Sequence, residues 1–127
     1  MKALGLPVIY PGLPDHPDHD LFLSVANPGY GHGGMLAVDC GTAECANEFI
    51  GVLQNDVTFG LIAVSLGYAD SLMSVSATST SSEISDVEQR GMGLSPGLLR
   101  ISVGITGSLE SRLQQMERAV RKVFARS

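Results

Sequence analysis

The stretch LLRISVGI, residues 98–105, decides the fold class of this chain. Apolar residues alternate along it with polar or small ones, and a period of two is the pattern of a β-strand that buries only one face. The apolar positions are Leu99, Ile101, Val103 and Ile105, and the intervening positions are Arg100, Ser102 and Gly104. We therefore expect a strand with one face against a core and with Arg100 on the opposite face.

A helix is expected soon after this strand. Ser108 stands in the N-cap position, where a hydroxyl accepts a hydrogen bond from a backbone N–H of the first turn. Apolar residues then recur at helical spacing and form one stripe, made of Leu109, Leu113, Met116, Val120 and Phe124. This stripe predicts a helix that packs on the core side of the sheet.

Two more helices are predicted by their caps. Thr42 caps an expected helix over residues 43–53, whose inner stripe consists of Ala46, Ile50 and Leu53. Ser85 and Glu88 have the spacing of a capping box, and Gly91 would end the short helix that they begin.

Three further apolar runs predict strands. They occupy residues 35–40, residues 59–66 and a shorter run that begins at Leu72. With a first helix near residue 17, the expected order is helix, strand, helix, strand, strand, short helix, strand and helix. This order predicts an α+β fold, a two-layer sandwich in which a mostly antiparallel sheet of about four strands carries helices on one face.

Length and composition fit one globular domain that spans residues 1–127. Hydrophobic residues make up 44% and charged residues 17% of the chain. The net charge of -5 argues against nucleic acid or an anionic membrane as a partner, because both are bound by clustered Lys and Arg. No apolar run approaches the roughly 20 residues that span a bilayer, and no secretory signal is recognisable at the N-terminus.

The two cysteines indicate a reducing environment. Cys40 and Cys45 have four residues between them, which matches neither a CxxC redox motif nor a zinc-binding pattern. We expect two reduced and partly buried thiols, and hence a cytoplasmic location.

The segment PGLPDHPDHDLF, residues 11–22, gathers two histidines and three aspartates. His16 and His19 could bind a metal ion, but the sequence offers no third ligand at a recognisable spacing, and the third histidine lies in a separate glycine-rich loop. The alternative is a helix N-terminus that Asp15 or His16 caps, with Pro17 in the first turn. We expect the helix and no metal site.

Two polar strand residues are candidates for chemistry. Arg100 is either a solvated charge or a guanidinium fork that grips a carboxylate through two N–H groups. Ser65 ends an apolar run and has no GxSxG turn or suitably spaced histidine, so it is not expected to act as a hydrolase nucleophile.

Several motifs in a fixed order carry a family resemblance. The segments YPGLPDHPDHDLF, GYGHGGMLAVD, FGLIAVSLGYADSLMSVSATSTSSE and GLSPGLLRISVGITGSLE resemble the C-terminal domain of the Cys/Met-metabolism family of enzymes that use pyridoxal phosphate (PLP). The resemblance runs from about Leu6 to Phe124. It implies the small C-terminal domain of a fold-type I PLP enzyme. Because the family includes cystathionine synthases, cystathionine lyases and methionine γ-lyase, it also implies a sulfur amino acid as substrate.

The resemblance implies roles for particular residues. The arginine of the family motif LxRxSVGxE, here Arg100, holds the substrate α-carboxylate, and the serine of SLG, here Ser65 followed by Leu66, lies beside cofactor and substrate. Val64 stands where relatives that cleave cystathionine often carry glutamate. An apolar side chain there suits a thioether such as methionine, which favours methionine γ-lyase over cystathionine γ-lyase.

The loop after residue 78 resembles the family only in part. Thr80 matches the threonine of the family's MTH sequence and is expected beside the active site, whereas Ser79 and Ser81 differ from the residues that usually flank it. The variant TSTSSE is similar to the plant-type methionine γ-lyases.

Family enzymes bind PLP through a lysine of a large N-terminal domain. The lysines of this chain, Lys2 and Lys122, lie in no motif that resembles that attachment point. We therefore expect the carboxylate-binding part of a carbon–sulfur lyase, with no catalytic residue of its own, inactive without a PLP-binding large domain or protomer, and assembled as a homo-oligomer. The alternatives are a stand-alone module that binds or interacts without catalysis and, less in keeping with the sequence, a metal-binding protein.

Overall fold

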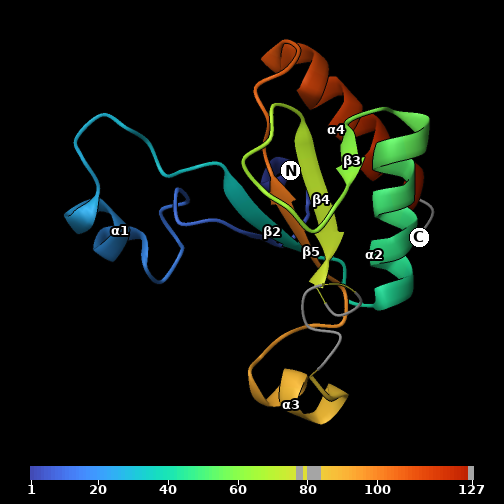
Figure 1. The fold of residues 1–127 in the computed structure, drawn as a ribbon, viewed down its shortest axis with the longest axis horizontal. Coiled ribbons are helices and arrows are strands. Elements are labelled where there is room, and N and C mark those ends of the chain that lie inside the picture. Colours follow the sequence, from blue (N-terminus) through green and yellow to red (C-terminus); the bar gives the residue numbers. More distant parts are fainter. Residues whose placement is uncertain (77–78, 80–83, 126–127) are drawn as a thin grey trace.

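The sheet has five strands and lies at the centre of the molecule (Figure 1). The computed structural model describes residues 1–76, 79 and 84–125. In spatial order the strands are β1 (Val8–Ile9), β2 (Met35–Asp39), β5 (Leu98–Ser102), β4 (Ser71–Val75) and β3 (Gly60–Ile62). All neighbours pair antiparallel except β3 and β4, which are parallel.

The helices are α1 (His19–Val25), α2 (Ala43–Gly51), α3 (Asp86–Gly91) and α4 (Leu109–Phe124). A short 3-10 helix occupies Lys2–Leu4, and a π-helical turn, Val52–Asp56, continues α2. Figure 1 shows α2 and α4 packed on one side of the sheet, whereas α1 and α3 project away from it. Within the described ranges, none of these helices has both the length and the apolar character needed to cross a bilayer.

The predicted α+β sandwich is confirmed, with one strand more than expected. The additional strand is β1, whose two residues pair with Val38 and Ala37 at the edge of the sheet. A two-residue strand shows no period, so no local pattern could reveal it.

The core forms between the sheet and the two packed helices. Leu99 and Ile101 of β5 are fully buried, together with Met73 of β4 and Phe49 of α2. The alternation in residues 98–102 therefore predicts the buried face correctly. The caps are also confirmed, because the side chain of Thr42 accepts from the Cys45 amide and that of Ser108 from the Ser111 amide.

The strands predicted around β5 and β3 are longer than those observed, and the stripe predicted on α4 is only partly buried. Strand β5 ends at Ser102, so Val103 and Ile105 are exposed and not buried. Strand β3 ends at Ile62, because the chain turns away after the Ala63 amide donates to the Met73 carbonyl. On α4, Met116 and Val120 are buried as expected, but Leu109 and Leu113 are exposed, because the helix begins beyond the packed layer (Figure 1).

The first helix begins later than predicted. Helix α1 starts at His19, and its N-cap, Asp18, makes no side-chain capping bond. Residues 11–18 instead form successive turns, in which the Asp18 amide donates to Nδ1 of His16. Asp15 does not cap the helix, because it forms an ion pair with Lys2.

Candidate functional site

Arg100 lies at the middle of the sheet, on the face opposite α2 and α4. Its neighbours across the strands are Ala37 of β2 and Ser74 of β4. Nη2 of its guanidinium donates to the main-chain carbonyl of Ser65 at 2.9 Å, and Nε is buried without a hydrogen-bond partner. Within the described residues the guanidinium faces no carboxylate in an ion pair. Its positive charge thus has no ion-pair partner within residues 1–76, 79 and 84–125.

The connection between β3 and β4, residues 63–70, crosses this second face of the sheet (Figure 1). Two hydrogen bonds hold it there: the one from Arg100 to the Ser65 carbonyl, and one at 3.1 Å from the Gly67 amide to Oγ of Ser102. The predicted site residues Ser65 and Arg100, which are 35 positions apart, are thus brought together. The contact uses the main chain of Ser65, and its side chain is exposed.

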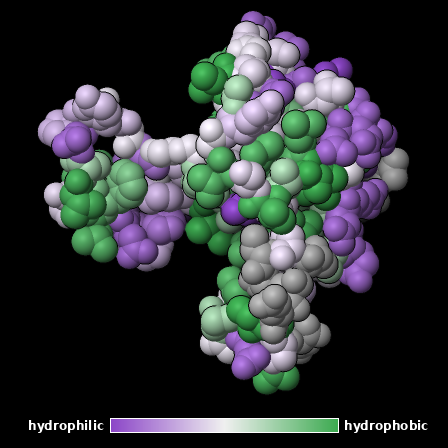
Figure 2. Space-filling view, viewed as in Figure 1, coloured by the Kyte–Doolittle hydropathy of each residue, from purple (hydrophilic) through white to green (hydrophobic). Residues whose placement is uncertain are grey.

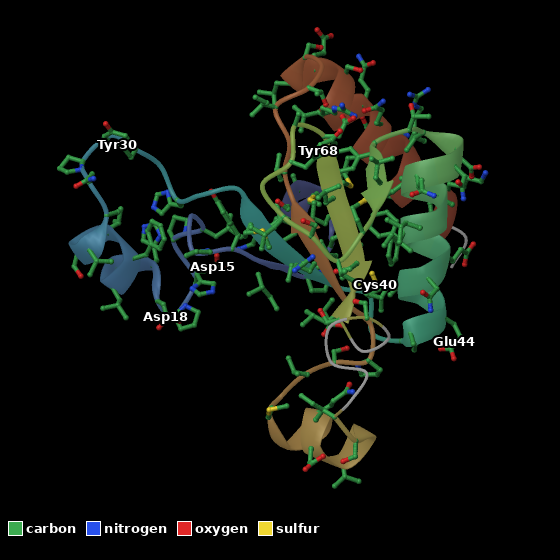
Figure 3. All side chains as sticks on the ribbon, viewed as in Figure 1. Asp15, Asp18, Tyr30, Cys40, Glu44 and Tyr68 are labelled. Atoms are coloured by element: carbon green, nitrogen blue, oxygen red, sulfur yellow. The ribbon has the colours of Figure 1, made fainter. Side chains whose placement is uncertain are left out.

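The same connection exposes three large apolar side chains. Val64 and Leu66 are 63% and 61% exposed, and Tyr68 is close to them in exposure. Figure 3 shows Tyr68 on this connection near the upper end of the sheet, and Figure 2 shows apolar side chains over the sheet and this connection, in contrast to the hydrophilic outer side of the helices. A large apolar surface of this kind usually binds a partner or a ligand.

A cavity of about 310 Å³ lies beside the candidate site. It opens at the edge of β4 beyond the end of β3, between α2 and the start of the 63–70 connection. Its lining is mostly apolar and consists of Asn47, Ile50, Ile62, Ala63, Val64, Ser74, Val75 and Ser79. Val64 and the cross-strand neighbour of Arg100 therefore border the same space.

One partly buried hydrogen-bond network holds the C-terminal end of the 63–70 connection. The guanidinium of Arg112 on α4 pairs with Asp70 at 3.1 Å and donates to the carbonyls of Phe59 and Thr106 at 2.7 and 2.9 Å. The Thr106 hydroxyl also bonds to Asp70. The Arg112 side chain thus links three segments: the residue before β4, the residue before β3 and the loop after β5. These bonds fix the position at which residues 63–70 rejoin the sheet.

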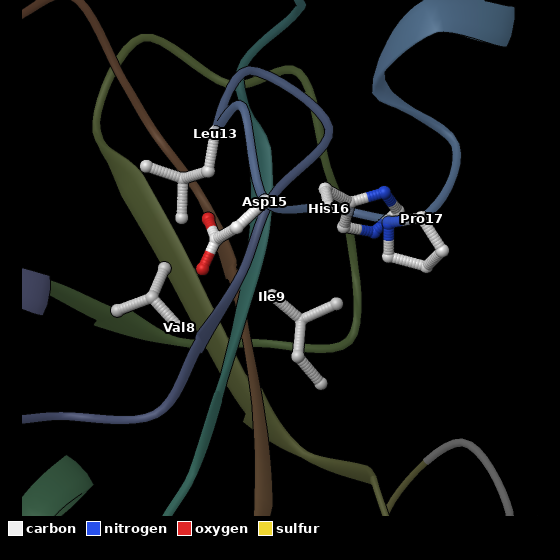
Figure 4. A pocket seen from close by; sticks show the side chains of 6 residues that line it. All are labelled: Val8, Ile9, Leu13, Asp15, His16 and Pro17. Carbon is white, nitrogen blue, oxygen red and sulfur yellow. The ribbon is translucent and has the colours of Figure 1, made fainter.

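The histidines of residues 11–22 do not converge. Figure 4 shows the Asp15 carboxylate directed toward Leu13 and Val8, while the His16 ring lies on the opposite side of the backbone beside Pro17. Among the described residues no group of three or more potential ligands is arranged to hold a metal ion.

His19 instead belongs to an aromatic cluster. Its Nδ1 lies 2.7 Å from the Pro11 carbonyl, and its ring stacks on His32 at 5.3 Å between centroids. Phe22 stacks on the same ring at 5.3 Å. The cluster packs α1 against the glycine-rich loop that contains His32. It therefore stabilises the part of the chain that projects from the sheet, where Figure 3 shows Tyr30.

The cysteines are close together but free. Burial raises the pKa of the Cys40 thiol to about 12, helped by the neighbouring Cys45 and Asp39. The pKa of Cys45 is also raised, mainly by burial. Raised pKa values keep both thiols protonated and unreactive at neutral pH.

Most of the chain matches one protein family. Residues 6–121 match the family model of the Cys/Met metabolism PLP-dependent enzymes. The chain belongs to this family. It is 50% identical over 119 residues to methionine gamma-lyase of Arabidopsis thaliana, an alignment that covers 94% of this chain and 27% of that protein.

Other family members support the same assignment. Cystathionine gamma-lyase of Bacillus subtilis is 37% identical over 114 residues, which cover 90% of this chain and 28% of the relative. The solved structure of cystathionine gamma-lyase from Lactobacillus plantarum complexed with L-serine superposes with a TM-score of 0.77 at 26% identity, over 96% of this chain and 31% of that chain. This chain therefore spans less than a third of the length of these relatives.

The described residues do not fit the cofactor attachment point of this PLP-dependent family. Both lysines are engaged at the surface, Lys2 with Asp15 and Lys122 with Asp56 at 2.5 Å. Neither amine is a neighbour of Arg100 in the sheet. What the described residues do offer is the guanidinium of Arg100, which has no ion-pair partner among them, and the apolar residues next to it.

Two parts of the site stand apart from the sequence predictions. Thr80 and Ser81 lie outside the described residues; the neighbouring Ser79 donates to the Val75 carbonyl at 2.6 Å. The residues that sequence reasoning missed are Ser74 and Arg112. Ser74 could have been recognised only from the strand register. Arg112 could not have been recognised, because a charged residue in the first turns of an amphipathic helix gives no sign of the hydrogen bonds that it forms.

Proposed function

We propose that this chain is the part of a PLP-dependent carbon–sulfur lyase, of the methionine γ-lyase type, that binds the α-carboxylate of a sulfur amino acid. The observation that carries the proposal is the guanidinium of Arg100, half-buried at mid-sheet, without an ion-pair partner in the described residues and held by the Ser65 carbonyl.

The physical argument rests on the charge of Arg100. A half-buried cation has lost part of its hydration, and the charge of an anionic ligand offsets that desolvation cost most effectively. A guanidinium also presents parallel N–H groups that match the two oxygens of a carboxylate. In the absence of a ligand, the bond to the Ser65 carbonyl occupies one N–H of this fork, and a carboxylate would compete for it.

The substrate class follows from the residue next to Ser65. Val64 brings an apolar side chain to the cavity beside Ser74, and none of the described residues that line the cavity is acidic. A thioether side chain fits such a lining better than the charged distal end of cystathionine. The similarity to a methionine gamma-lyase supports the same choice.

Catalysis requires a second component. When bound, PLP supplies an electron sink for reactions at the α-carbon of an amino acid, and the amine that holds it would come from a large domain. The apolar surface over the sheet and the 63–70 connection is suited to contact that domain or another protomer. We place such an assembly in the cytoplasm. Within it, Arg100 binds and orients the substrate, and Val64 excludes water from the substrate's side chain.

The test is made in the complete enzyme, with this chain joined to a PLP-binding large domain. Arg100→Lys should raise KM for L-methionine about 10-fold or more, because an ammonium cannot reproduce the two-pronged contact. Arg121→Ala, which removes a surface guanidinium on α4, is the matched control and should leave KM unchanged. An unchanged KM in Arg100→Lys would remove Arg100 from the site, and binding of L-methionine without any turnover in the wild type would indicate a non-catalytic binding module.

A second variant tests the substrate class. Val64→Glu places a carboxylate beside the cavity, where it can meet the distal ammonium group of cystathionine. We expect kcat/KM for L-methionine to fall and that for cystathionine to rise. If both substrates respond alike, Val64 does not select the side chain.

A further inference from the structure

Ser74 carries a buried hydroxyl. It lies in β4 and is 1% exposed, and its Oγ makes no hydrogen bond with any other described residue. The other two buried serines of the sheet are both engaged: Oγ of Ser71 accepts from the Gly104 amide, and Oγ of Ser102 accepts from the Gly67 amide. The unpartnered state of Ser74 is therefore an exception within this sheet.

Arg100, directly opposite Ser74 on the neighbouring strand, has an unpaired donor that could complement the Ser74 hydroxyl. Ser74 pairs in register with Arg100, whose Nε–H is also buried without a partner. Side chains that face each other in an antiparallel pair start about 5 Å apart at Cβ, so a small rotation brings hydroxyl and Nε within hydrogen-bond reach. A buried polar group without a partner is destabilising, and a mutual bond would satisfy both groups.

We propose that Ser74 is a positioning residue of the carboxylate site: its Oγ accepts the Nε–H of Arg100 when a carboxylate draws the Nη atoms away from the Ser65 carbonyl. In this structure Nη2 donates to the Ser65 carbonyl, and Nε of Arg100 and Oγ of Ser74 form no hydrogen bond with each other. Binding of a carboxylate competes for Nη2, and the new bond to Ser74 fixes the plane of the guanidinium with both Nη atoms toward the ligand.

The place of Ser74 in the fold supports this role. On the side away from Arg100, β3 has already ended, and Ser74 borders the cavity with Ile62, Ala63 and Val64. One side chain thus lies between the group that anchors the carboxylate and the apolar space proposed for the thioether. The inference rests on the proposed function, since it describes how the same arginine receives its ligand.

The experiment compares Ser74→Ala and Ser74→Thr with Ser71→Ala in the full 127-residue chain. Ser71 is the matched control, because it is equally buried on the same strand but its hydroxyl has a partner. Stability is measured by urea unfolding. Binding of L-methionine is followed through the Nε–Hε resonance of Arg100, which is assigned by its loss in Arg100→Lys.

For Ser74→Ala the affinity for L-methionine should fall without a loss of stability. Removing an unpartnered buried hydroxyl should leave the urea midpoint unchanged or higher, whereas the apparent affinity for L-methionine should fall about fivefold. Ser74→Thr keeps the hydroxyl, and its extra methyl group can enter the adjoining cavity, so its affinity should equal that of the wild type. Ser71→Ala should lower the midpoint without changing the affinity.

The possible failures are distinguishable. If L-methionine does not shift the wild-type Nε–Hε resonance, the carboxylate site itself is wrong and the proposed function fails with this inference. If the wild type responds and Ser74→Ala binds equally well, Arg100 remains the anchor and only the role of Ser74 is overturned.

Discussion

Replacing Arg112 by alanine should destabilise the fold far more than replacing any exposed arginine of the same helix. Arg112 donates to the carbonyl of Phe59, to the carbonyl and the hydroxyl of Thr106 and to the carboxylate of Asp70. Its side chain is only 20% exposed, and its guanidinium lies 5.9 Å from the centre of the Phe59 ring.

The expected loss can be worked out from these contacts. Three bonds to backbone or hydroxyl groups contribute about 1 kcal/mol each in net terms. The stacking on Phe59 adds about 0.5 to 1 kcal/mol. Because Asp70 is partly exposed, its ion pair adds little. Arg112→Ala should therefore lower the free energy of unfolding by about 3 to 4 kcal/mol, a large share of the roughly 5 to 15 kcal/mol typical of a domain.

The assay is urea unfolding followed by far-UV circular dichroism, since the chain has no tryptophan to report by fluorescence. The control is Arg121→Ala. That guanidinium is 72% exposed and pairs with Glu117 one helical turn away, so its loss should cost under about 0.5 kcal/mol. Equal losses for the two variants would refute the reasoning that Arg112 joins the connection to the sheet.

Three further outcomes are expected. Burial raises the pKa of the Cys40 thiol to about 12 in the folded chain, whereas the unfolded chain ionises near the ordinary value of 9.0, so the free energy of unfolding should fall as pH rises from 9 toward 12. Cys40→Ala should flatten this decline in urea titrations. Parallel pH curves for the two proteins would contradict the prediction. Gly104→Ala should cost about 3 kcal/mol, because a Cβ there would lie 2.4 Å from the Ala69 carbonyl oxygen and 2.3 Å from the Asp70 carbonyl carbon; a thermal midpoint like that of the wild type would show that the backbone can yield. Gly51→Ala, at a helical position with open space around it, should instead stabilise by up to about 1 kcal/mol, and a lower midpoint would disprove that.

The helices and strands of the core follow from local rules. Period-two alternation identifies β5 and its buried face, and Thr42 and Ser108 mark the helices that they cap, because a strand or helix exposes its face and its first N–H groups regardless of what lies far along the chain. The same rules give the wrong length where an apolar residue has no packing partner. Leu113 and Ile105 fit their periodic patterns yet lie in the open, since periodicity says which side a residue faces and not whether anything covers that side.

The sequence by itself determined the fold class and the family, and its family resemblance predicted Arg100 as the residue that holds a carboxylate. Only the tertiary structure decided what surrounds that arginine: the parallel pairing of β3 with β4 sends residues 63–70 across the second face of the sheet, and the register of β4 with β5 places Ser74 opposite Arg100. Register and connection path depend on which strands become neighbours. That choice is made by contacts between residues far apart in the chain, so no local pattern contains it.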